Sequence, residues 1–341
     1  MTSIPTIGIC IPTRNQAGTL AETLHSAFAQ TRAPIDVIVC DDAGSDDTPA
    51  VIDTFRAQLP ADQRAILRYV RHPQALGIGG NFDFAVRAAH GTYCVKVDSD
   101  DVLEPTYIET LAALLDAHPQ AGWAHCNVLN IHPDGRPISL AHNRKRSGFA
   151  PPPQVFQSYL HHNDTCHCVL IRRAAYETAG GYRPVMRTCE DWLLWLEMCL
   201  AGFGNVYCEH PLARMRKYHD RQELMARRRL DFVDAAARML ATMESSLTEA
   251  RAHTLGVSPA SAITTLRNSV AGQVRYAVLH EADPAVRTRL LDAIIQFAPT
   301  PRNRLWCQAA RRLPPPLMRL PTQLDAAARH VARKTLQLFR G

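Results

Sequence analysis

The chain has 341 residues, 46% hydrophobic and 21% charged, which is ordinary for a soluble globular protein and suits two domains or one large α/β domain with an appendage. The net charge of +6 is uneven: residues 1–215 carry 17 basic and 22 acidic side chains (−5), and residues 216–341 carry 21 and 10 (+11). No window approaches the roughly 20 apolar residues of a membrane-spanning helix, and the start MTSIPTIGICIPTRN lacks the features of a signal peptide, so we expect a cytoplasmic protein.

Apolar runs alternate with helical spacing in the first part of the chain. Continuous apolar runs, typical of strands buried on both faces, occur at 6–11, 35–40, 66–70 and 93–97. Helical spacing separates these runs at 19–30, 48–59 and 81–89. The alternation predicts an α/β fold with a Rossmann-like, mostly parallel sheet that binds ligands at the carboxyl ends of its strands.

The pattern changes after residue 105. Helices are predicted at 107–117, 173–179 and 191–200, and strands at 123–128 and 166–171. Residues 142–153, HNRKRSGFAPPP, are basic and then proline-rich, which predicts a mobile loop over the sheet. From residue 221 the chain is predicted to be helical, with proline breaks at 259, 284, 299–301 and 314–316. We therefore expect a domain at 1–220, with halves at 1–105 and 106–220, and a basic helical region at 221–341.

Polar clusters follow three of the predicted strands. They are PTRN at 12–15, DDAGSDDT at 41–48 and DSDD at 98–101. Because the carboxyl ends of parallel strands share one edge of the sheet, these clusters are expected to meet in one crevice.

The cluster after the fourth strand needs a positive partner. Asp98, Asp100 and Asp101 lie within four consecutive positions, directly after a run predicted to be buried. Like charges that close repel one another, and burial strengthens the repulsion. The partner is a protein side chain, a metal ion or only water. Carboxylates with one spacer on an extended backbone can converge on Mg²⁺ or Mn²⁺, which takes oxygen ligands and keeps places for substrate phosphates.

Neighbouring segments offer contacts for the rest of a nucleotide. The carboxylates of Asp41 and Asp42 can accept hydrogen bonds from a nucleobase imide or a ribose hydroxyl, with Pro12 and Thr13 presenting backbone groups to the same ring. The stretch LGIGGN at 76–81 predicts either an anion at a helix N-terminus or a turn without a ligand.

A fourth acidic site begins a predicted helix. Glu190 and Asp191 precede Trp192 and Trp195. One interpretation is a helix cap, and the other is a general base whose pKa is tuned by its surroundings.

Taken in order, these motifs resemble glycosyltransferase family 2, an inverting family with the GT-A fold. The resemblance covers roughly residues 4–220 and also includes Gly77 with Asn81, GTY at 91–93, GGY at 180–182 and EDW at 190–192. It implies an enzyme that moves a sugar from a nucleotide-diphosphate donor to a hydroxyl of a saccharide or lipid-linked saccharide. It also implies Mn²⁺ or Mg²⁺ as the cofactor and a role in cell-surface polysaccharide or glycoconjugate biosynthesis.

The resemblance assigns roles to individual residues. Asp191 would deprotonate the acceptor hydroxyl with support from Glu190. The nucleobase of the donor would lie against Asp42 and Thr13, although the sequence AGS after Asp42 leaves open whether the Asp41 or the Asp42 carboxylate faces it. The implied donor-binding residues are Pro12, Thr13, Asn15, Asp41, Asp42, Gly77, Asn81, Asp98 and Ser99. The implied metal ligands are Asp100, Asp98 and His219.

The stretch RMRKYH at 214–219 departs from the Arg-x-His of many family members. Lys217 to His219 fits if lysine replaces arginine, whereas Arg216 fits only with an extra residue. His219 is either a metal or phosphate contact or a surface histidine. The Gln-x-x-Arg-Trp motif of processive synthases is absent, which argues against a polysaccharide-extruding synthase.

The C-terminal residues 302–341 carry nine basic side chains and one acidic side chain, with an apolar stripe from Leu320 to Leu338. This helix either packs on its own domain or a second subunit, or it contacts an anionic membrane peripherally. No motif supports nucleic-acid binding.

Two other functions compete with sugar transfer. A nucleotidyltransferase that makes a sugar nucleotide would carry a basic glycine-rich loop early, and residues 8–20 hold one arginine and no lysine. A non-catalytic nucleotide-sugar-binding protein would have lost Asp100 or Asp191, and both are present.

Overall fold

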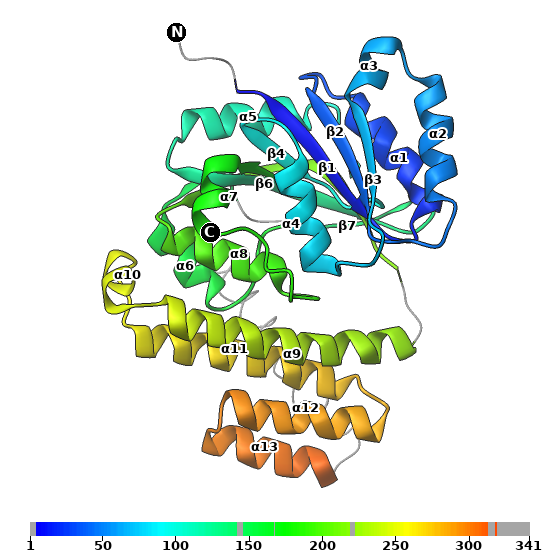
Figure 1. The fold of residues 1–341 in the computed structure, drawn as a ribbon. Coiled ribbons are helices and arrows are strands. Elements are labelled where there is room, and N and C mark those ends of the chain that lie inside the picture. Colours follow the sequence, from blue (N-terminus) through cyan, green and yellow to red (C-terminus); the bar gives the residue numbers. More distant parts are fainter. Residues whose placement is uncertain (1–4, 142–145, 167, 219–221, 313–317, 319–341) are drawn as a thin grey trace, which may run out of the picture. The chain divides into compact units, whose positions relative to one another are not determined.

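The computed structural model describes residues 5–141, 146–166, 168–218, 222–312 and 318 (Figure 1). The described residues form two compact units: those within 1–219 and 243–259 make up the first, and those within 220–242 and 260–341 make up the second. The sequence-based boundary near residue 220 lies at the first change of unit. Residues 243–259 add a segment to the first unit that the composition did not indicate.

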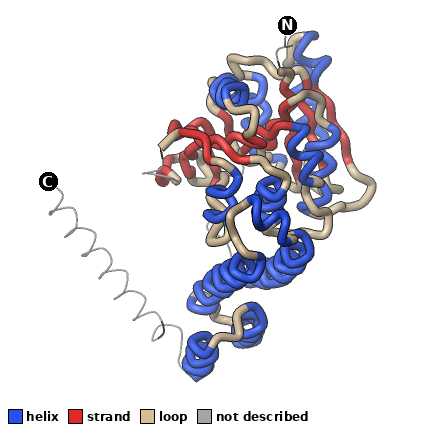
Figure 2. Tube along the Cα trace, turned by 90° about the vertical axis from the view of Figure 1, so that its left-hand side faces the viewer, coloured by secondary structure: helices blue, strands red, loops and turns tan. Residues whose placement is uncertain are grey.

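The first unit is built on one sheet with helices on both of its faces (Figures 1 and 2). Its strands are β1 (Ile7–Thr13), β2 (Asp36–Asp41), β3 (Leu67–Arg71), β4 (Tyr93–Lys96), β5 (Val102–Leu103), β6 (Ala121–Ile131), β7 (Pro137–Leu140), β8 (Gly148–Ala150), β9 (Val169–Arg172) and β10 (Gly204–Arg216). Its helices are α1 (Ala17–Phe28), α2 (Thr48–Gln58), α3 (Ala61–Ile66), α4 (Ile78–Ala88), α5 (Tyr107–Ala117), α6 (Pro152–Tyr159), α7 (Arg173–Ala179), α8 (Glu190–Leu200) and α10 (Glu249–Thr254).

The strands lie in the order β3-β2-β1-β4-β9-β6-β10-β5, with β7 beside β6 and β8 beside β10. The first four strands of this order are parallel, as are β6 and β10. In contrast, β9 is antiparallel to both of its neighbours, β4 and β6. The predicted α/β class is confirmed. The predicted parallel arrangement holds for the four strands β3, β2, β1 and β4, whereas the rest of the sheet is mixed. The sequence did not predict this difference, because apolar patterns report burial and not strand direction.

The central strands owe their position to continuous apolar runs. Every residue of β1 and β2 is buried, which requires cover on both faces of the sheet. Leu20 and Leu24 of α1 pack in the same core as Ile9, Val37 and Val95. Each buried Leu, Ile or Val side chain contributes about 1.5–3 kcal/mol to the free energy of folding, so this packing of helix against strand is strongly favoured.

The segment at 142–153 differs from its prediction as a mobile loop. Residues 142–145 lie outside the described residues. Gly148–Ala150 forms β8, which pairs antiparallel with β10, and α6 begins at Pro152. Proline is well tolerated in the first turn of a helix, so the proline-rich stretch starts a helix here instead of extending a loop.

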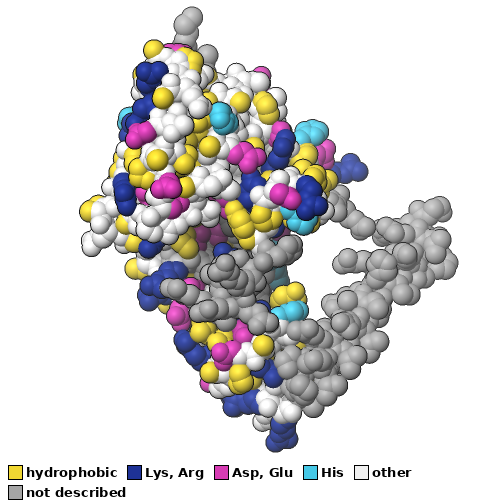
Figure 3. Space-filling view, turned by 90° about the vertical axis from the view of Figure 1, so that its right-hand side faces the viewer, with side chains coloured by type: hydrophobic (Ala, Val, Ile, Leu, Met, Phe, Trp, Pro, Cys, Tyr) yellow, Lys and Arg dark blue, Asp and Glu magenta, His cyan; other side chains and the backbone are white. Residues whose placement is uncertain are grey.

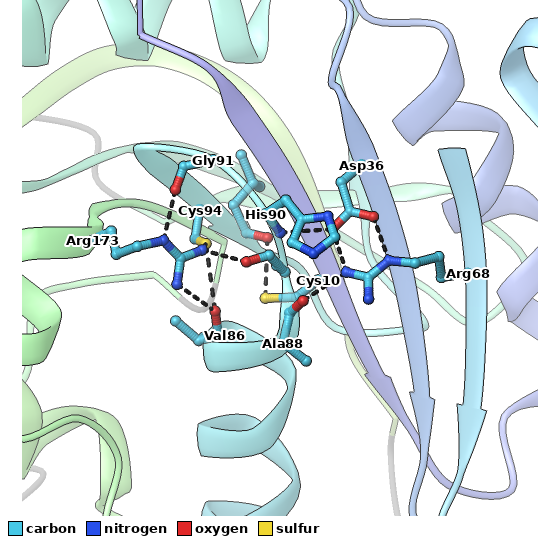
Figure 4. Close-up of polar contacts among 11 residues, drawn as sticks. Cys10, Asp36, Arg68, Val86, Ala88, His90, Gly91, Cys94 and Arg173 are labelled. Atoms are coloured by element: carbon cyan, nitrogen blue, oxygen red, sulfur yellow. Dashed lines mark hydrogen bonds and ion pairs between the residues drawn. The ribbon is translucent and has the colours of Figure 1, made fainter. Parts of the chain in front are cut away.

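A network of polar bonds closes the amino ends of the central strands (Figure 4). Arg68 donates to the Asp36 carboxylate at 2.7 and 2.5 Å and to the Ala88 carbonyl at 2.6 Å, and the His90 N–H donates to Asp36 at 2.7 Å. Arg173 donates to the Gly91 carbonyl at 2.6 Å. These bonds connect the end of α4 and the start of β4 to the neighbouring strands, so this edge of the sheet is held in place by the fold.

The second unit is helical. It contains most of α9 (Gln222–Ser246), together with α11 (Pro259–Leu279), α12 (Pro284–Phe297) and α13 (Pro301–Arg312). Three of the predicted proline breaks are helix starts, as expected for a residue that fits the first helical turn. No helix among the described residues combines the length and the apolar character needed to cross a membrane.

Charged side chains of both signs are interspersed on the face drawn in Figure 3, so the residues described there show no large field of one sign. Five of the nine basic residues at 302–341, and the apolar stripe from Leu320 to Leu338, lie outside the described residues. Both alternatives for this region, packing on its own domain or a second subunit and peripheral contact with a membrane, stay predictions.

Candidate active site

The carboxyl ends of β1, β2 and β4 bring three polar clusters to one edge of the sheet. Thr13 is the register partner of Asp41, and the Asp42 N–H donates to the Thr13 carbonyl at 2.9 Å. On the other side of β1, the N–H of Val97 donates to the Cys10 carbonyl at 3.1 Å. Residues 12–15, 41–48 and 98–101 therefore follow neighbouring strand ends, as expected for parallel strands.

Asp41 holds the turn that follows β2. Its fully buried carboxylate accepts the Gly44 N–H and the Tyr69 hydroxyl, each at 2.8 Å, and lies 3.6 Å from the Arg71 Nε atom. Burial and then the hydrogen bond to Asp41 raise the pKa of Tyr69. A Cβ atom on Gly44 would lie 2.8 Å from an Asp41 oxygen, so a larger residue here would displace the carboxylate that holds the turn. The fold itself thus uses Asp41.

Asp42 binds the glycine loop that the sequence offered as an anion site. Its carboxylate accepts the N–H groups of Leu76 at 2.6 Å and Gly77 at 3.1 Å, and Arg14 lies 3.7 Å away. Gly77 has φ of 80° and immediately precedes α4, whose N-terminal dipole favours negative charge. An anion is therefore bound at this helix start, and it is the chain's own carboxylate.

Two asparagines expected at the donor connect loops in the structure. Asn15 has φ of 55°, and its side-chain oxygen accepts the Ser45 N–H at 2.7 Å. The buried side chain of Asn81 donates to the Cys40 carbonyl at 2.9 Å and bonds His72 at 3.1 Å. Both side chains shape segments that border the strand ends, and their contact with a donor stays a prediction.

Residues 98–101, which follow β4 after Val97, have different environments. The Asp98 side chain is 26% exposed and lies 2.8 Å from the Lys96 ammonium nitrogen, whereas Ser99 and Asp101 are buried. Asp101 accepts the Arg216 N–H at 3.0 Å, which attaches this segment to β10. Burial and then the Asp98 charge raise the pKa of Asp100. Asp101 thus serves the fold, which leaves Asp98 and Asp100 as the candidates for ligand chemistry.

Lys96 is the positive side chain that the acidic cluster requires. It ends β4, its side chain is only 2% exposed, and its ammonium lies 4.1 Å from the centre of the Phe82 ring. Burial alone would lower its pKa, but the charges of Asp98, Glu190 and Asp191 raise it above the usual value. The sequence analysis did not identify Lys96, although a lysine inside the apolar run YCVKV was the available signal.

Arg216, the other cation near the cluster, is bound by the fold. Its side chain is 3% exposed, donates to the carbonyls of Asp100 at 3.0 Å and Pro133 at 2.7 Å, and contacts Glu22 at 2.5 Å. This clamp between β10 and two loops does not fit the diphosphate role considered for Arg216. His219, the alternative at this motif, lies outside the described residues.

Glu190 and Asp191 begin α8, after Cys189 with φ of 59°. The Asp191 carboxylate accepts the Asn163 side-chain N–H at 2.9 Å and the Trp192 N–H at 2.7 Å. Glu190 is buried, and its Oε2 atom has no hydrogen-bond partner among the described residues. Burial and then the Asp191 charge raise the pKa of Glu190 to about 8. A helix cap alone would not need a buried carboxyl group beside an oriented one. The sequence analysis missed Asn163, which orients the Asp191 carboxylate.

The two acidic sites lie within electrostatic reach of each other. Asp98 acts on Glu190 by raising its pKa, after the larger effects of burial and Asp191, and Lys96 acts on it in the opposite direction. Lys96 in turn interacts with Asp98, Glu190 and Asp191. A carboxylate after β4 and a carboxyl pair on α8 therefore share one buried cation.

No cluster of three or more His, Cys, Asp or Glu side chains suited to a metal ion occurs in the part of the chain that the structure describes. Asp98 and Asp100 nevertheless supply the oxygen donors that Mg²⁺ and Mn²⁺ prefer. Asp98 raises the pKa of Asp100, so a divalent cation at this pair would relieve an existing repulsion. The pair fits a cation whose remaining ligands are water and phosphate oxygens.

Two cavities of the first unit lie apart from these carboxylates. One, of about 280 Å³, is lined by Thr178, Ala179, Gly180, Arg183, Glu197, Leu200, Ala201, Ser246 and Arg251. The other, of about 530 Å³, is lined by Leu76, Gly80, Asp83, Phe84, Arg87, Ala88 and Pro184. Neither lining includes Asp98, Asp100 or Asp191, so the titratable groups mark the candidate site better than cavity volume does.

Comparison with known proteins gives consistent matches. A family model described as glycosyl transferase family 2 matches residues 8–180. The chain is 26% identical over 225 residues to a putative glycosyltransferase, EpsE, of Bacillus subtilis, covering 64% of this chain and 76% of that protein. It is 29% identical over 200 residues to chondroitin synthase of Escherichia coli, covering 58% of this chain and only 27% of that longer protein.

A solved structure extends the likeness beyond the matched domain. The crystal structure of S. aureus TarS residues 1–349 in complex with UDP-GlcNAc is similar with a TM-score of 0.62 and 16% sequence identity. The match covers 90% of this chain and 87% of that chain. At this identity the likeness shows a shared fold.

Proposed function

Because the chain belongs to glycosyl transferase family 2, we propose that it moves a sugar from a nucleotide-diphosphate donor to an acceptor hydroxyl, with a divalent cation and with inversion of the anomeric carbon. The chain is a glycosyltransferase, and the GT-A fold with a helical C-terminal region predicted from the sequence is confirmed by the likeness to TarS. The observation that carries the proposed mechanism is the 2.8 Å ion pair of Lys96 with Asp98, together with the electrostatic effect of Glu190 and Asp191 on the same lysine.

The donor is proposed to lie along the ends of β1, β2 and β4. The Thr13 hydroxyl is buried without a hydrogen-bond partner among the described residues, so a ligand group would satisfy it. Asp42 is proposed to face the nucleobase, because it follows the end of β2, whereas Asp41 is the last residue of that strand and holds the turn after it. The Asp42 carboxylate is itself buried and accepts the Leu76 and Gly77 N–H groups, so the nucleobase would share this carboxylate with the glycine loop. The TarS complex with UDP-GlcNAc supports uridine as the first nucleotide to test.

Asp191 is proposed to be the general base. Asn163 and the Trp192 N–H orient its carboxylate, which takes the proton of the acceptor hydroxyl as that oxygen bonds to the anomeric carbon. The bond from this carbon to the diphosphate breaks, and its electron pair leaves with the diphosphate, so one displacement inverts the centre. Because the pKa of Glu190 is about 8, Glu190 holds its proton at neutral pH and leaves Asp191 to act.

Asp98 and Asp100 are the proposed ligands of the divalent cation. When bound, the cation would supply positive charge that stabilises the departing diphosphate. Asp98 and Asp100 would hold the cation at the end of β4, where the Lys96 ammonium lies 2.8 Å from Asp98.

The acceptor is proposed to be a saccharide or lipid-linked saccharide of a cell-surface polysaccharide or glycoconjugate. The similarity to a chondroitin synthase supports this class. Since the match covers 27% of that protein, it does not carry over a particular acceptor.

A donor screen tests the proposal. UDP-, GDP- and dTDP-sugars are added with Mn²⁺ and saccharide acceptors, and both thermal stabilisation and released nucleotide are measured. We expect one donor class to stabilise the protein and to release its nucleoside diphosphate. A nucleotidyltransferase would instead release pyrophosphate from a nucleoside triphosphate and a sugar phosphate, and a non-catalytic protein would be stabilised without release. Either of these results would refute sugar transfer.

A further inference from the structure

The buried Lys96 forms an ion pair with the partly exposed Asp98 at the end of β4. The Lys96 ammonium lies 2.8 Å from an Asp98 carboxylate oxygen and is covered by the Phe82 ring at 4.1 Å. With its side chain 2% exposed, Lys96 has almost no contact with bulk water. A buried charge without a partner is strongly unfavourable, so the pair holds Asp98 in one position.

Resting on the proposed function, we infer that Lys96 competes with the divalent cation for Asp98 and thereby makes cation binding depend on the nucleotide diphosphate. Lys96 is then a positioning residue: it acts on the donor through Asp98. In the absence of nucleotide, the Lys96 ammonium neutralises Asp98 in place of the divalent cation. When the cation enters with a diphosphate, Asp98 is shared between the two.

The charges around Lys96 give the physical basis. The acidic groups that act on it are Asp98 after its own strand and Asp191 on α8, together with Glu190, which is uncharged at neutral pH. A cation bound to Asp98 would lie within a few ångströms of the ammonium, because both bind the same carboxylate. Two positive charges at that range repel strongly even at an effective dielectric constant of about 20. The negative charge of a diphosphate offsets this repulsion, so the cation is held well only when both are present.

Linkage turns this geometry into a measurable quantity. If the diphosphate raises the affinity for the cation, the cation raises the affinity for the diphosphate by the same factor. Removing the charge of Lys96 should therefore strengthen the binding of the cation alone and reduce this factor. A purely structural lysine would change stability and leave the factor as it is.

The test measures Mn²⁺ binding to the full chain by titration calorimetry, alone and with saturating UDP or GDP. The wild-type protein is expected to bind Mn²⁺ at least about tenfold more tightly with nucleotide than without it. Lys96→Met, which keeps the length of the side chain, should bind Mn²⁺ alone about tenfold more tightly than wild type and lose most of the dependence on nucleotide. Lys96→Arg, which keeps the charge, should behave like wild type.

A matched control comes from the other end of the sheet. Arg68→Met removes the cationic partner of the buried Asp36, so it should lower the melting temperature without changing Mn²⁺ affinity. A folded Lys96→Met or, if that variant does not fold, Lys96→Gln with unchanged or weaker Mn²⁺ binding would overturn the inference. Equal Mn²⁺ affinity of the wild type with and without a bound nucleotide would do the same. These titrations need no sugar transfer, so they judge Lys96 even if the donor screen fails.

Discussion

The two ends of the central strands each pair an aspartate with a cation, and they differ in which partner is buried, Asp36 at one end and Lys96 at the other, and in what surrounds the pair. At the amino end, Asp36 is bonded by Arg68 and by the His90 N–H, and this network is closed (Figure 4). At the carboxyl end, Lys96 bonds Asp98, while Asp100 and Glu190 add carboxyl groups whose pKa values are raised, in both cases first by burial. A matched pair serves the fold, whereas an excess of carboxyl groups over cations marks the place where a ligand is needed.

The largest effect is expected at Asp191, on the side with excess acid. Asp191→Asn keeps the shape of the side chain and removes the proton acceptor, so the rate of transfer should fall by about 10²–10⁴-fold. Donor binding, measured by thermal shift with nucleotide and Mn²⁺, should remain. Transfer at the wild-type rate would show that another group is the base.

Asp100→Ala should weaken the site on the donor side. With one of two proposed cation ligands removed, Mn²⁺-dependent stabilisation by the donor nucleotide should be lost, and nucleotide affinity in Mn²⁺ should fall roughly tenfold or more. The measurement is the melting temperature with nucleotide in the presence of Mn²⁺ and of a chelator. Unchanged stabilisation would reject Asp100 as a cation ligand.

Arg68→Met should affect only the amino end. Loss of the bonds to Asp36 should lower the free energy of unfolding by about 2 kcal/mol, less than for a fully buried pair because the Arg68 side chain is 34% exposed. Urea denaturation at neutral pH measures this change. Transfer per folded molecule should be the same as in wild type, and a loss of transfer would mean that the two ends are coupled.

The smallest effect is expected from Glu190→Gln, and it depends on pH. The pKa of Glu190 is raised to about 8 in the folded protein, so the unfolded chain loses this proton at lower pH and stability falls as pH rises toward 8. Glutamine removes this penalty. Relative to wild type, the variant's melting temperature should rise by about 2–4 °C at pH 8 and change little at pH 5. A difference that does not vary with pH would contradict the assigned pKa.

Local patterns predicted the elements well because burial and period are properties of neighbouring residues. The apolar runs at 6–11 and 35–40 each begin one residue before the strands they predict, β1 and β2, and Pro259, Pro284 and Pro301 start helices. The predicted helix at 81–89 begins earlier, at Ile78, because Gly77 with φ of 80° turns the chain into it. The direction of β9 between β4 and β6 was not predictable, since an apolar run has the same composition in either direction.

The sequence by itself determined the family, the α/β class and the order in which acidic residues follow the strands, because these depend on spacing along the chain. Only the tertiary structure decided how the acids divide: Asp41 and Asp101 are used by the fold, Asp42 binds the start of α4, and Asp98 pairs with Lys96. Which cation neutralises a carboxylate depends on the distance between them in space and on the exclusion of water. Lys96 comes within electrostatic range of Glu190 and Asp191 only in the folded chain.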